Sequence, residues 1–192
     1  HMSFNMGPTP LSWLEAQAPA TYAAVLAADA ESAARFGGHG SAMAQAYNHV
    51  IMPLADERDK RTQVAWGVAD FRHRFGRRPE GMWLPETAVD VPTLEVLAEA
   101  GVAFTVLAPR QAARVRGPGA DWRDVRAGGV DPTRSYKVAL PSGRSIAVFF
   151  YDGPVSQAVA FEGLLTRGEH LAGRLSAAFP SDAHDRALAH VA

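Results

Sequence analysis

The stretch that decides the fold runs from residue 81 to residue 107 and reads GMWLPETAVDVPTLEVLAEAGVAFTVL. It contains two short apolar runs, Gly81 to Leu84 and Val102 to Leu107, which are typical of strands buried on both faces. Between them, Asp90 to Ala100 has the apolar spacing of a helix, and Gly101 marks its end. The stretch therefore predicts a β-α-β unit with two parallel strands in a sheet that helices cover.

Further helices are expected on both sides of this unit. Apolar residues recur at helical spacing in Leu11 to Gln17, Thr21 to Phe36, Asp56 to Phe75, Val155 to Leu165, Glu169 to Phe179 and Asp182 to Val191. Ser41 is a candidate N-cap for a short helix that ends at Tyr47. These helices leave little of the chain for strands.

Only a few more strands are expected. Ser3 to Asn5 is strand-like, and Tyr136 to Leu140 and Ser145 to Tyr151 flank a Pro-Ser-Gly-Arg turn, which predicts a hairpin. A closed α/β barrel needs about eight strands. The 192 residues are therefore expected to form one partial domain of such a barrel, with flanking strands missing at both ends. His1 and Met2 resemble a cloning remnant.

The composition excludes several classes of function. With 47% hydrophobic and 20% charged residues and a formal net charge of -1, the chain matches an ordinary globular protein and not a polyanion-binding one, so nucleic acid is not expected as a partner. No apolar run approaches the roughly 20 residues of a membrane span, and no signal peptide is recognised, so a cytoplasmic protein is expected. The chain has no cysteine, so any nucleophile is an oxygen or a nitrogen.

Glu86 is the leading candidate for chemistry. It follows the Gly81 to Leu84 strand directly, and catalytic groups in α/β folds sit just past the carboxyl ends of strands. A carboxylate near Trp83 suits sugar chemistry, because Glu can attack an anomeric carbon while an indole ring stacks on a sugar face. The alternative is structural: Glu86 opens a helix and interacts with its dipole, and Trp83 lies in the core.

Two other polar features are candidates. His39, Asn48 and His49 lie in loop-like sequence and could contact sugar hydroxyls or a metal, although their spacing does not match the helical i, i+4 ligand pattern and such histidines are often structural. Asp152 follows the apolar run Ile146 to Tyr151 at a strand end, but it could equally cap the next helix.

These residues resemble a known family. Residues 81–86, GMWLPE, closely resemble the nucleophile motif of glycoside hydrolase family 57, which contains α-glucan-active amylases, 4-α-glucanotransferases and branching enzymes on an incomplete, seven-stranded β/α barrel. Residues 40–54 are similar to the family's preceding motif. Residues 4–9 and 38–40 resemble a branch of the family with a further domain behind the barrel.

The resemblance implies specific roles. Glu86 would be the nucleophile of a retaining mechanism, His49 a contact to the sugar in the cleavage subsite, and Trp83 a wall or stacking group; His39 and Asn48 are further candidates for binding substrate. An α-glucan or related polysaccharide would be the partner. The resemblance implies no metal and no cofactor.

Two parts of the family's pattern are not found. A His-containing first motif is expected before Ser3, and the acid/base, an Asp in an Asp-x-Glu segment, is expected beyond Ala192, because Asp152-Gly153-Pro154 has Pro where Glu is expected. A retaining enzyme needs two carboxyl groups about 5–5.5 Å apart. We therefore expect the 192-residue chain to be nearly inactive alone, with Asp152 as the second candidate for the catalytic acid.

Two alternative functions stay open. A carbohydrate deacetylase on a similar barrel would use a divalent metal held by Asp and His to activate water. A non-catalytic carbohydrate-binding module would use Glu86 and Trp83 only to bind sugar. In each case an incomplete barrel exposes strand edges that favour self-association.

Overall fold

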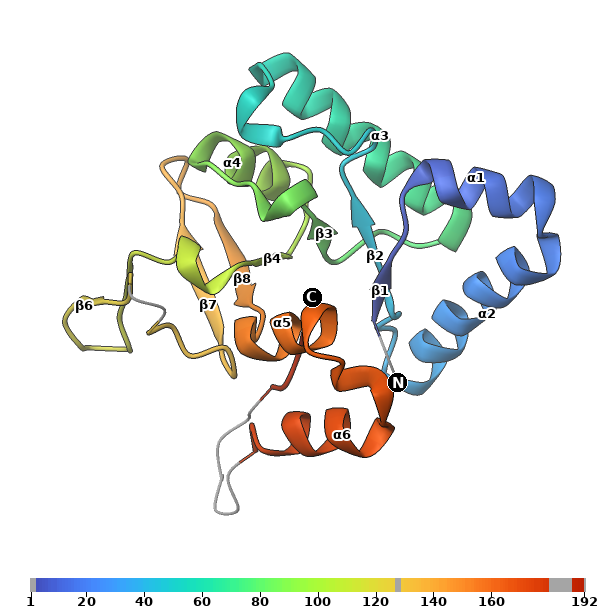
Figure 1. The fold of residues 1–192 in the computed structure, drawn as a ribbon. Helices are drawn as coiled ribbons and strands as arrows, with labels where there is room; N and C mark the ends of the chain where they lie inside the picture. The colour runs from blue at the N-terminus through green and yellow to red at the C-terminus, as the bar shows by residue number, and fades with distance from the viewer. Residues whose placement is uncertain (1–2, 127–128, 180–187, 192) are drawn as a thin grey trace. The chain divides into compact units, whose positions relative to one another are not determined.

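The computed structural model describes residues 3–126, 129–179 and 188–191 (Figure 1). The chain divides into two compact units, one made of residues 1–105 and 138–146 and the other of residues 106–137 and 147–192. Among the described residues, no helix is both long enough and apolar enough to span a membrane.

The helices of the first unit agree with the sequence prediction. They are α1 (Pro8–Gln17), α2 (Pro19–Arg35), α3 (Glu57–Phe75) and α4 (Val91–Glu99). The ends of α3 illustrate why the sequence was informative. The Asp56 carboxylate caps the first turn by accepting the N–H of Asp59 at 2.8 Å, and Gly76 ends the helix in the left-handed conformation with φ 66°.

A parallel sheet lies beside these helices in the order β1 (Phe4–Asn5), β2 (Ala42–Gln45), β3 (Met82–Trp83). The first strand confirms the strand expected at Ser3 to Asn5. The short helix expected from Ser41 to Tyr47 is wrong, because this segment contains β2. Alanines favour a helix in isolation, but pairing with a strand on each side overrides that propensity.

The β-α-β prediction is confirmed for the direction of its strands. Gly81 forms a parallel bridge to Phe104, the first residue of β4 (Phe104–Leu107), and α4 lies between these strands in sequence. A second sheet has the order β4, β8 (Ser145–Phe150), β7 (Ser135–Ala139). The turn between β7 and β8 has Gly143 at φ 82°, as the predicted hairpin requires. Among the described residues, these strands form small sheets rather than a seven-stranded barrel.

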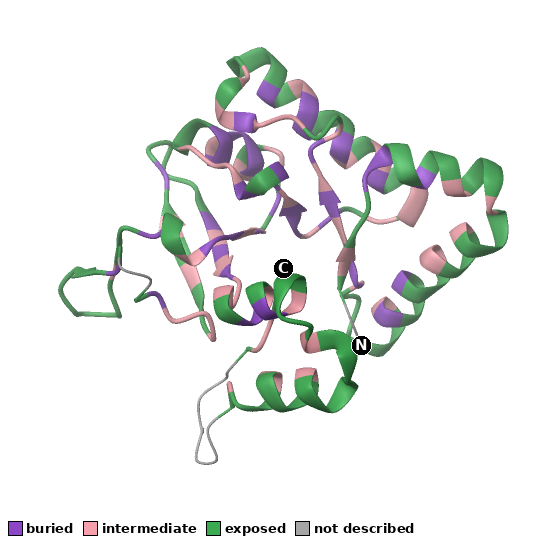
Figure 2. Cartoon of the chain, viewed as in Figure 1, coloured by how far each residue is buried: buried purple, intermediate pink, exposed green. Residues whose placement is uncertain are grey.

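The core of the first unit joins β2, β3, α3 and α4 (Figure 2). Its fully buried side chains include Met52, Val64, Met82, Leu84 and Leu97. The helix α3 approaches β2 so closely at Gly67 that a Cβ there would lie 2.2 Å from the backbone oxygen of Gln45. Only glycine permits this contact, which fixes α3 against the strand that leads to His49.

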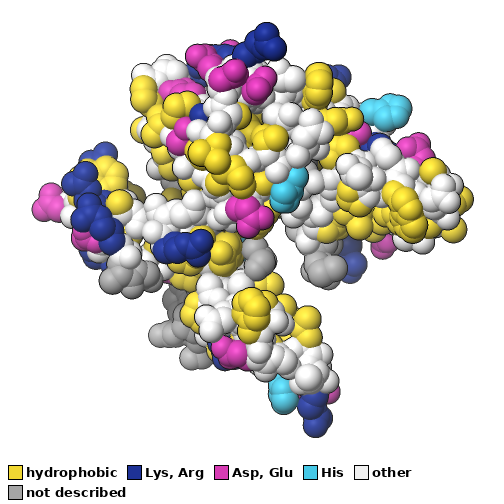
Figure 3. All heavy atoms as spheres, turned by 45° about the horizontal axis from the view of Figure 1, so that its top comes forward, with side chains coloured by type: hydrophobic (Ala, Val, Ile, Leu, Met, Phe, Trp, Pro, Cys, Tyr) yellow, Lys and Arg dark blue, Asp and Glu magenta, His cyan; other side chains and the backbone are white. Residues whose placement is uncertain are grey.

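The second unit contains the short strands β5 (Arg114–Val115) and β6 (Arg123–Asp124), which pair antiparallel. Figure 3 shows basic side chains gathered around this hairpin, where Arg114 and Arg116 lie over the ring of Trp122.

The remaining helices of the second unit are α5 (Gly153–Phe161) and α6 (Gly168–Ser176). The helix expected from Val155 to Leu165 ends earlier because Gly163 adopts φ 67° and a 3₁₀ turn follows. Most of the helix expected from Asp182 to Val191 lies outside the described residues, and the described part, Leu188 to Val191, is not helical.

Candidate active site

The fold brings His49 and Glu86 together. His49 follows β2 and Glu86 follows β3, and because these neighbouring strands are parallel, both residues lie at the carboxyl edge of the sheet. The Nε2 atom of His49 is 3.7 Å from Oε1 of Glu86. Their side chains are 59% and 74% exposed, so both are accessible to a ligand. The predicted strand-end position of Glu86 is confirmed.

Backbone strain is concentrated at this pair. Among the described residues, the non-glycine residues with positive φ are His49 at 53°, Glu86 at 56° and Thr87 at 53°. Each costs on the order of 1–2 kcal/mol, because the left-handed conformation brings Cβ close to the backbone. Such strain persists only where the surrounding structure enforces it, and it is common at active sites.

The structure does not support a role for Glu86 as the opening residue of a helix. The helix α4 begins at Val91, and Asp90 is its cap, accepting the N–H of Thr93 at 2.8 Å. Glu86 instead lies in a single 3₁₀ turn, Pro85–Thr87, in which the N–H of Thr87 donates to the oxygen of Leu84. The turn holds the carboxylate clear of the sheet and does not use it as a cap.

The strain at Glu86 leads to a stability prediction. Glu86→Gly is expected to leave the free energy of unfolding unchanged or to raise it by up to about 1 kcal/mol, because relief of the positive φ offsets the greater freedom of the unfolded chain. Glu31→Gly, an exposed position within α2, is the control and is expected to lose about 1 kcal/mol. Urea unfolding measures both. Equal losses in the two variants would contradict a strained Glu86.

Two other predicted residues lie near the pair along the chain. Trp83 is half-buried on β3, three residues before Glu86. Asn48 is exposed beside His49, and its backbone N–H donates to Oε1 of Gln63 at 2.7 Å. Both therefore belong to the segments that carry the His49–Glu86 pair.

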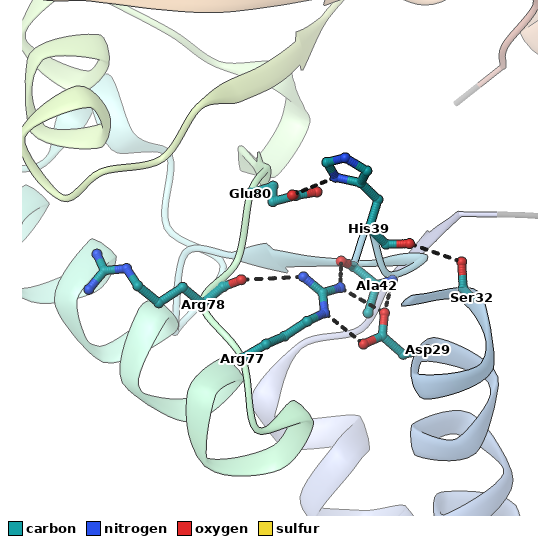
Figure 4. A network of polar contacts seen from close by, with 7 residues as sticks. All are labelled: Asp29, Ser32, His39, Ala42, Arg77, Arg78 and Glu80. Atoms are coloured by element: carbon teal, nitrogen blue, oxygen red, sulfur yellow. Dashed lines mark hydrogen bonds and ion pairs between the residues drawn. The ribbon is translucent and has the colours of Figure 1, made fainter. Parts of the chain in front are cut away.

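The structure does not bring His39 to this pair. The Nδ1 atom of His39 lies 2.7 Å from Oε1 of Glu80 (Figure 4). These residues precede β2 and β3, so they lie at the amino edge of the sheet, opposite Glu86. In α/β barrels the carboxyl edge carries catalysis and the amino edge contributes to stability.

A buried ion pair reinforces the amino edge (Figure 4). The Asp29 carboxylate accepts hydrogen bonds from Nε and Nη2 of Arg77 at 2.8 and 2.7 Å, and from the N–H of Ala42 at 2.7 Å. Burial alone would raise the pKa of Asp29, but the hydrogen bonds from Arg77 and Ala42 outweigh it and lower the pKa. The pair ties α2 to the start of β2 and to the segment after α3.

Asp152 belongs to the second unit and acts as a helix cap there. Its carboxylate accepts the N–H of Val155 at 2.9 Å, at the start of α5. The capping alternative is thus present in the structure, and a role as catalytic acid stays a prediction. In the described ranges, no group of three or more His, Asp or Glu side chains is placed to hold a metal ion.

Comparisons with known proteins identify the family and the fold. The model of glycosyl hydrolase family 57 matches residues 37–192. No curated protein matches the sequence. Among solved structures, the chain resembles an exo-type maltose-forming amylase from Pyrococcus sp. ST04, with TM-score 0.64 and 21% identity over 84% of this chain and 24% of that one.

Two further structures are similar. A 4-α-glucanotransferase from Thermococcus litoralis has TM-score 0.60 and 18% identity over 85% of this chain and 24% of its own. A branching enzyme from Thermococcus kodakaraensis has TM-score 0.52 and 20% identity over 76% and 28%. The chain thus spans about a quarter of the length of these structures, and at such identities the similarity shows the fold. Because the family model matches residues 37–192, which is most of the chain, the chain belongs to glycosyl hydrolase family 57.

Proposed function

We propose that this chain is part of a retaining glycoside hydrolase or transglycosylase that acts on α-glucans, with Glu86 as the nucleophile. The observation that carries the proposal is the exposed His49–Glu86 pair at the carboxyl edge of the sheet, held by a strained backbone. Membership of family 57 supports the reaction class. Similarity to a maltose-forming amylase and a 4-α-glucanotransferase supports α-glucan as substrate.

In this mechanism the Glu86 carboxylate attacks the anomeric carbon of the sugar. The bond to the leaving oxygen breaks, that oxygen takes a proton from a catalytic acid, and a glycosyl ester forms on Glu86. A water molecule or a sugar hydroxyl then attacks the anomeric carbon of the ester, the bond from that carbon to the Glu86 oxygen breaks, and the attacking group gives its proton to the deprotonated acid. Water gives hydrolysis, and a second sugar gives transfer. In this proposal His49, 3.7 Å from Glu86, contacts the same sugar ring, and the half-buried Trp83 stacks on a sugar face.

The catalytic acid is proposed to lie outside the 192 residues. Within the described residues, the alternative candidate for the acid is Asp152, which follows a strand end. Its carboxylate already accepts the N–H of Val155 as a helix cap. A chain without its acid loses roughly 10²–10⁴-fold in rate. The 192-residue chain alone is therefore expected to turn over α-glucans far more slowly than a longer version that includes the flanking sequence.

The test uses that longer version and an α-1,4-linked oligosaccharide. Proton NMR of the first product is expected to show the α anomer, because two displacements restore the starting configuration. A first product with the β anomer would contradict a retaining mechanism. Acetate release from an acetylated sugar that depends on an added divalent cation would favour the deacetylase alternative.

A further inference from the structure

The helix α3 has polar side chains on its buried face. Its buried residues are Lys60, Gln63, Val64, Gly67 and Phe71, which recur at intervals of three or four and form one stripe. Lys60 and Gln63 are only 5% and 8% exposed. Burying an ammonium or amide group costs free energy unless the group has hydrogen-bond partners. The partners of these two side chains therefore identify the segments that the side chains fix in place.

Gln63 holds the segment that leads to His49. Its Oε1 accepts the backbone N–H of Asn48 at 2.7 Å, and its backbone oxygen accepts the N–H of Tyr47 at 3.3 Å. These two amides immediately precede His49, the residue with φ 53°. One residue of α3, through its side chain and its backbone oxygen, thus fixes the backbone that leads to the strained histidine.

Lys60 holds the segment that follows Glu86. Its Nζ donates to Oδ2 of Asp90 at 2.8 Å, while Oδ1 of Asp90 accepts both the N–H and the hydroxyl of Thr93. Burial alone would raise the pKa of Asp90, but the hydrogen bonds from Lys60 and Thr93 outweigh it and lower the pKa. Asp90 is therefore a charged anchor between α3 and the end of the loop that contains Glu86.

We propose that Lys60 and Gln63 are positioning residues, which together set the separation of His49 and Glu86. They lie three residues apart on one face of α3, so a single rigid helix holds both loops of the site. Neither touches substrate, because both are buried. Their effect on the reaction rate rests on the proposed function of Glu86. Their effect on the positions of the two loops does not depend on that function. Misplacement of a catalytic group by about 1 Å can cost up to 10²-fold in rate.

The first measurement is hydrogen exchange in the 192-residue chain. Gln63→Met keeps most of the side-chain volume but has no acceptor oxygen, so the Asn48 amide is expected to exchange about tenfold faster. Amides within α3 should keep their relative protection. Gln63→Glu retains an acceptor oxygen and is expected to restore the slow exchange. Gln157→Met, the same change at an exposed position of α5, is the control and should leave Asn48 unchanged.

Lys60 is tested in the same way. Lys60→Met removes the ammonium that holds Asp90, so the Thr93 amide is expected to exchange about tenfold faster, while Lys60→Arg keeps a donor and should largely protect it. Unchanged exchange at Asn48 in Gln63→Met, or at Thr93 in Lys60→Met, would overturn the corresponding half of the proposal.

The second measurement is turnover of an α-glucan by the longer protein. Gln63→Met and Lys60→Met are each expected to lower kcat about 10- to 100-fold with little change in KM, and the conservative variants should recover most of kcat. Faster exchange with an unchanged kcat would overturn the claim that these residues set the site geometry. If the wild-type longer protein had no turnover, the proposed function would fail, yet faster Asn48 exchange would still support the hold of Gln63 on the His49 loop.

Discussion

Glu86→Gln is expected to abolish α-glucan turnover in the longer protein, with a fall in kcat of more than about 10⁴-fold, the scale of losing an enzymatic nucleophile. An amide has nearly the size of a carboxylate but cannot form the glycosyl ester. The side chain is 74% exposed, so stability should change by less than about 0.5 kcal/mol. Steady-state kinetics and urea unfolding measure the two effects.

The matched control is Glu80→Gln, which makes the same change in the His39–Glu80 pair at the amino edge of the same strands. Its turnover is expected to stay within a few-fold of wild type, since that edge does not carry the chemistry. Asp152→Asn is a second comparison, because Asn caps a helix about as well as Asp. Activity lost in Asp152→Asn would make Asp152 the acid, and activity kept in Glu86→Gln would remove Glu86 from the mechanism.

Arg77→Met is expected to destabilise the first unit by about 3–5 kcal/mol, because it leaves the buried Asp29 carboxylate without its ionic partner. The space around the Asp29–Arg77 ion pair is tightly filled, because a Cβ on Gly40 would lie 2.2 Å from Nη2 of Arg77 and 2.3 Å from Oδ1 of Asp29. Arg72→Met, at an exposed position in the last turn of α3, is the control and should change stability by less than about 0.5 kcal/mol. Urea unfolding of both variants gives the comparison.

The same ion pair predicts how stability depends on pH. The pKa of Asp29 is lower in the folded chain than in the unfolded chain, where it is about 3.9. Its contribution is therefore complete above about pH 4 and is lost as the pH falls through the folded pKa. The decrease in the free energy of unfolding at acid pH should therefore be smaller in Arg77→Met. Equal urea midpoints for Arg77→Met and Arg72→Met would show that the pair does not stabilise the fold.

The sequence predicted the parts of the fold that local chemistry determines. Helix α3 has an acidic cap at its start and a glycine at its end, and the apolar run before Glu86 has the composition of a buried strand. The strand β2 could not be predicted in this way. Its residues, AMAQ, have helical propensity, and only pairing with β1 and β3 makes them a strand.

The site was only partly predictable for the same reason. Glu86 and His49 could be selected from strand ends and family motifs, but their 3.7 Å approach depends on β2 and β3 being parallel neighbours. Gln63 and Lys60 were missed because their partners lie 15 and 30 residues away in sequence. A signal was present, since both fall in the three-and-four spacing of the apolar residues Val64 and Phe71.

The role of Glu86 is the central claim, and covalent trapping tests it most directly. A fluorinated α-glucosyl fluoride forms a glycosyl ester that hydrolyses slowly, so the longer protein incubated with it should gain the mass of one fluorosugar. Peptide mapping by mass spectrometry is expected to place that label on Glu86, within residues 81–89, and Glu86→Gln should gain none. A label on another carboxylate, or continued glucan turnover with no label on Glu86, would contradict the account.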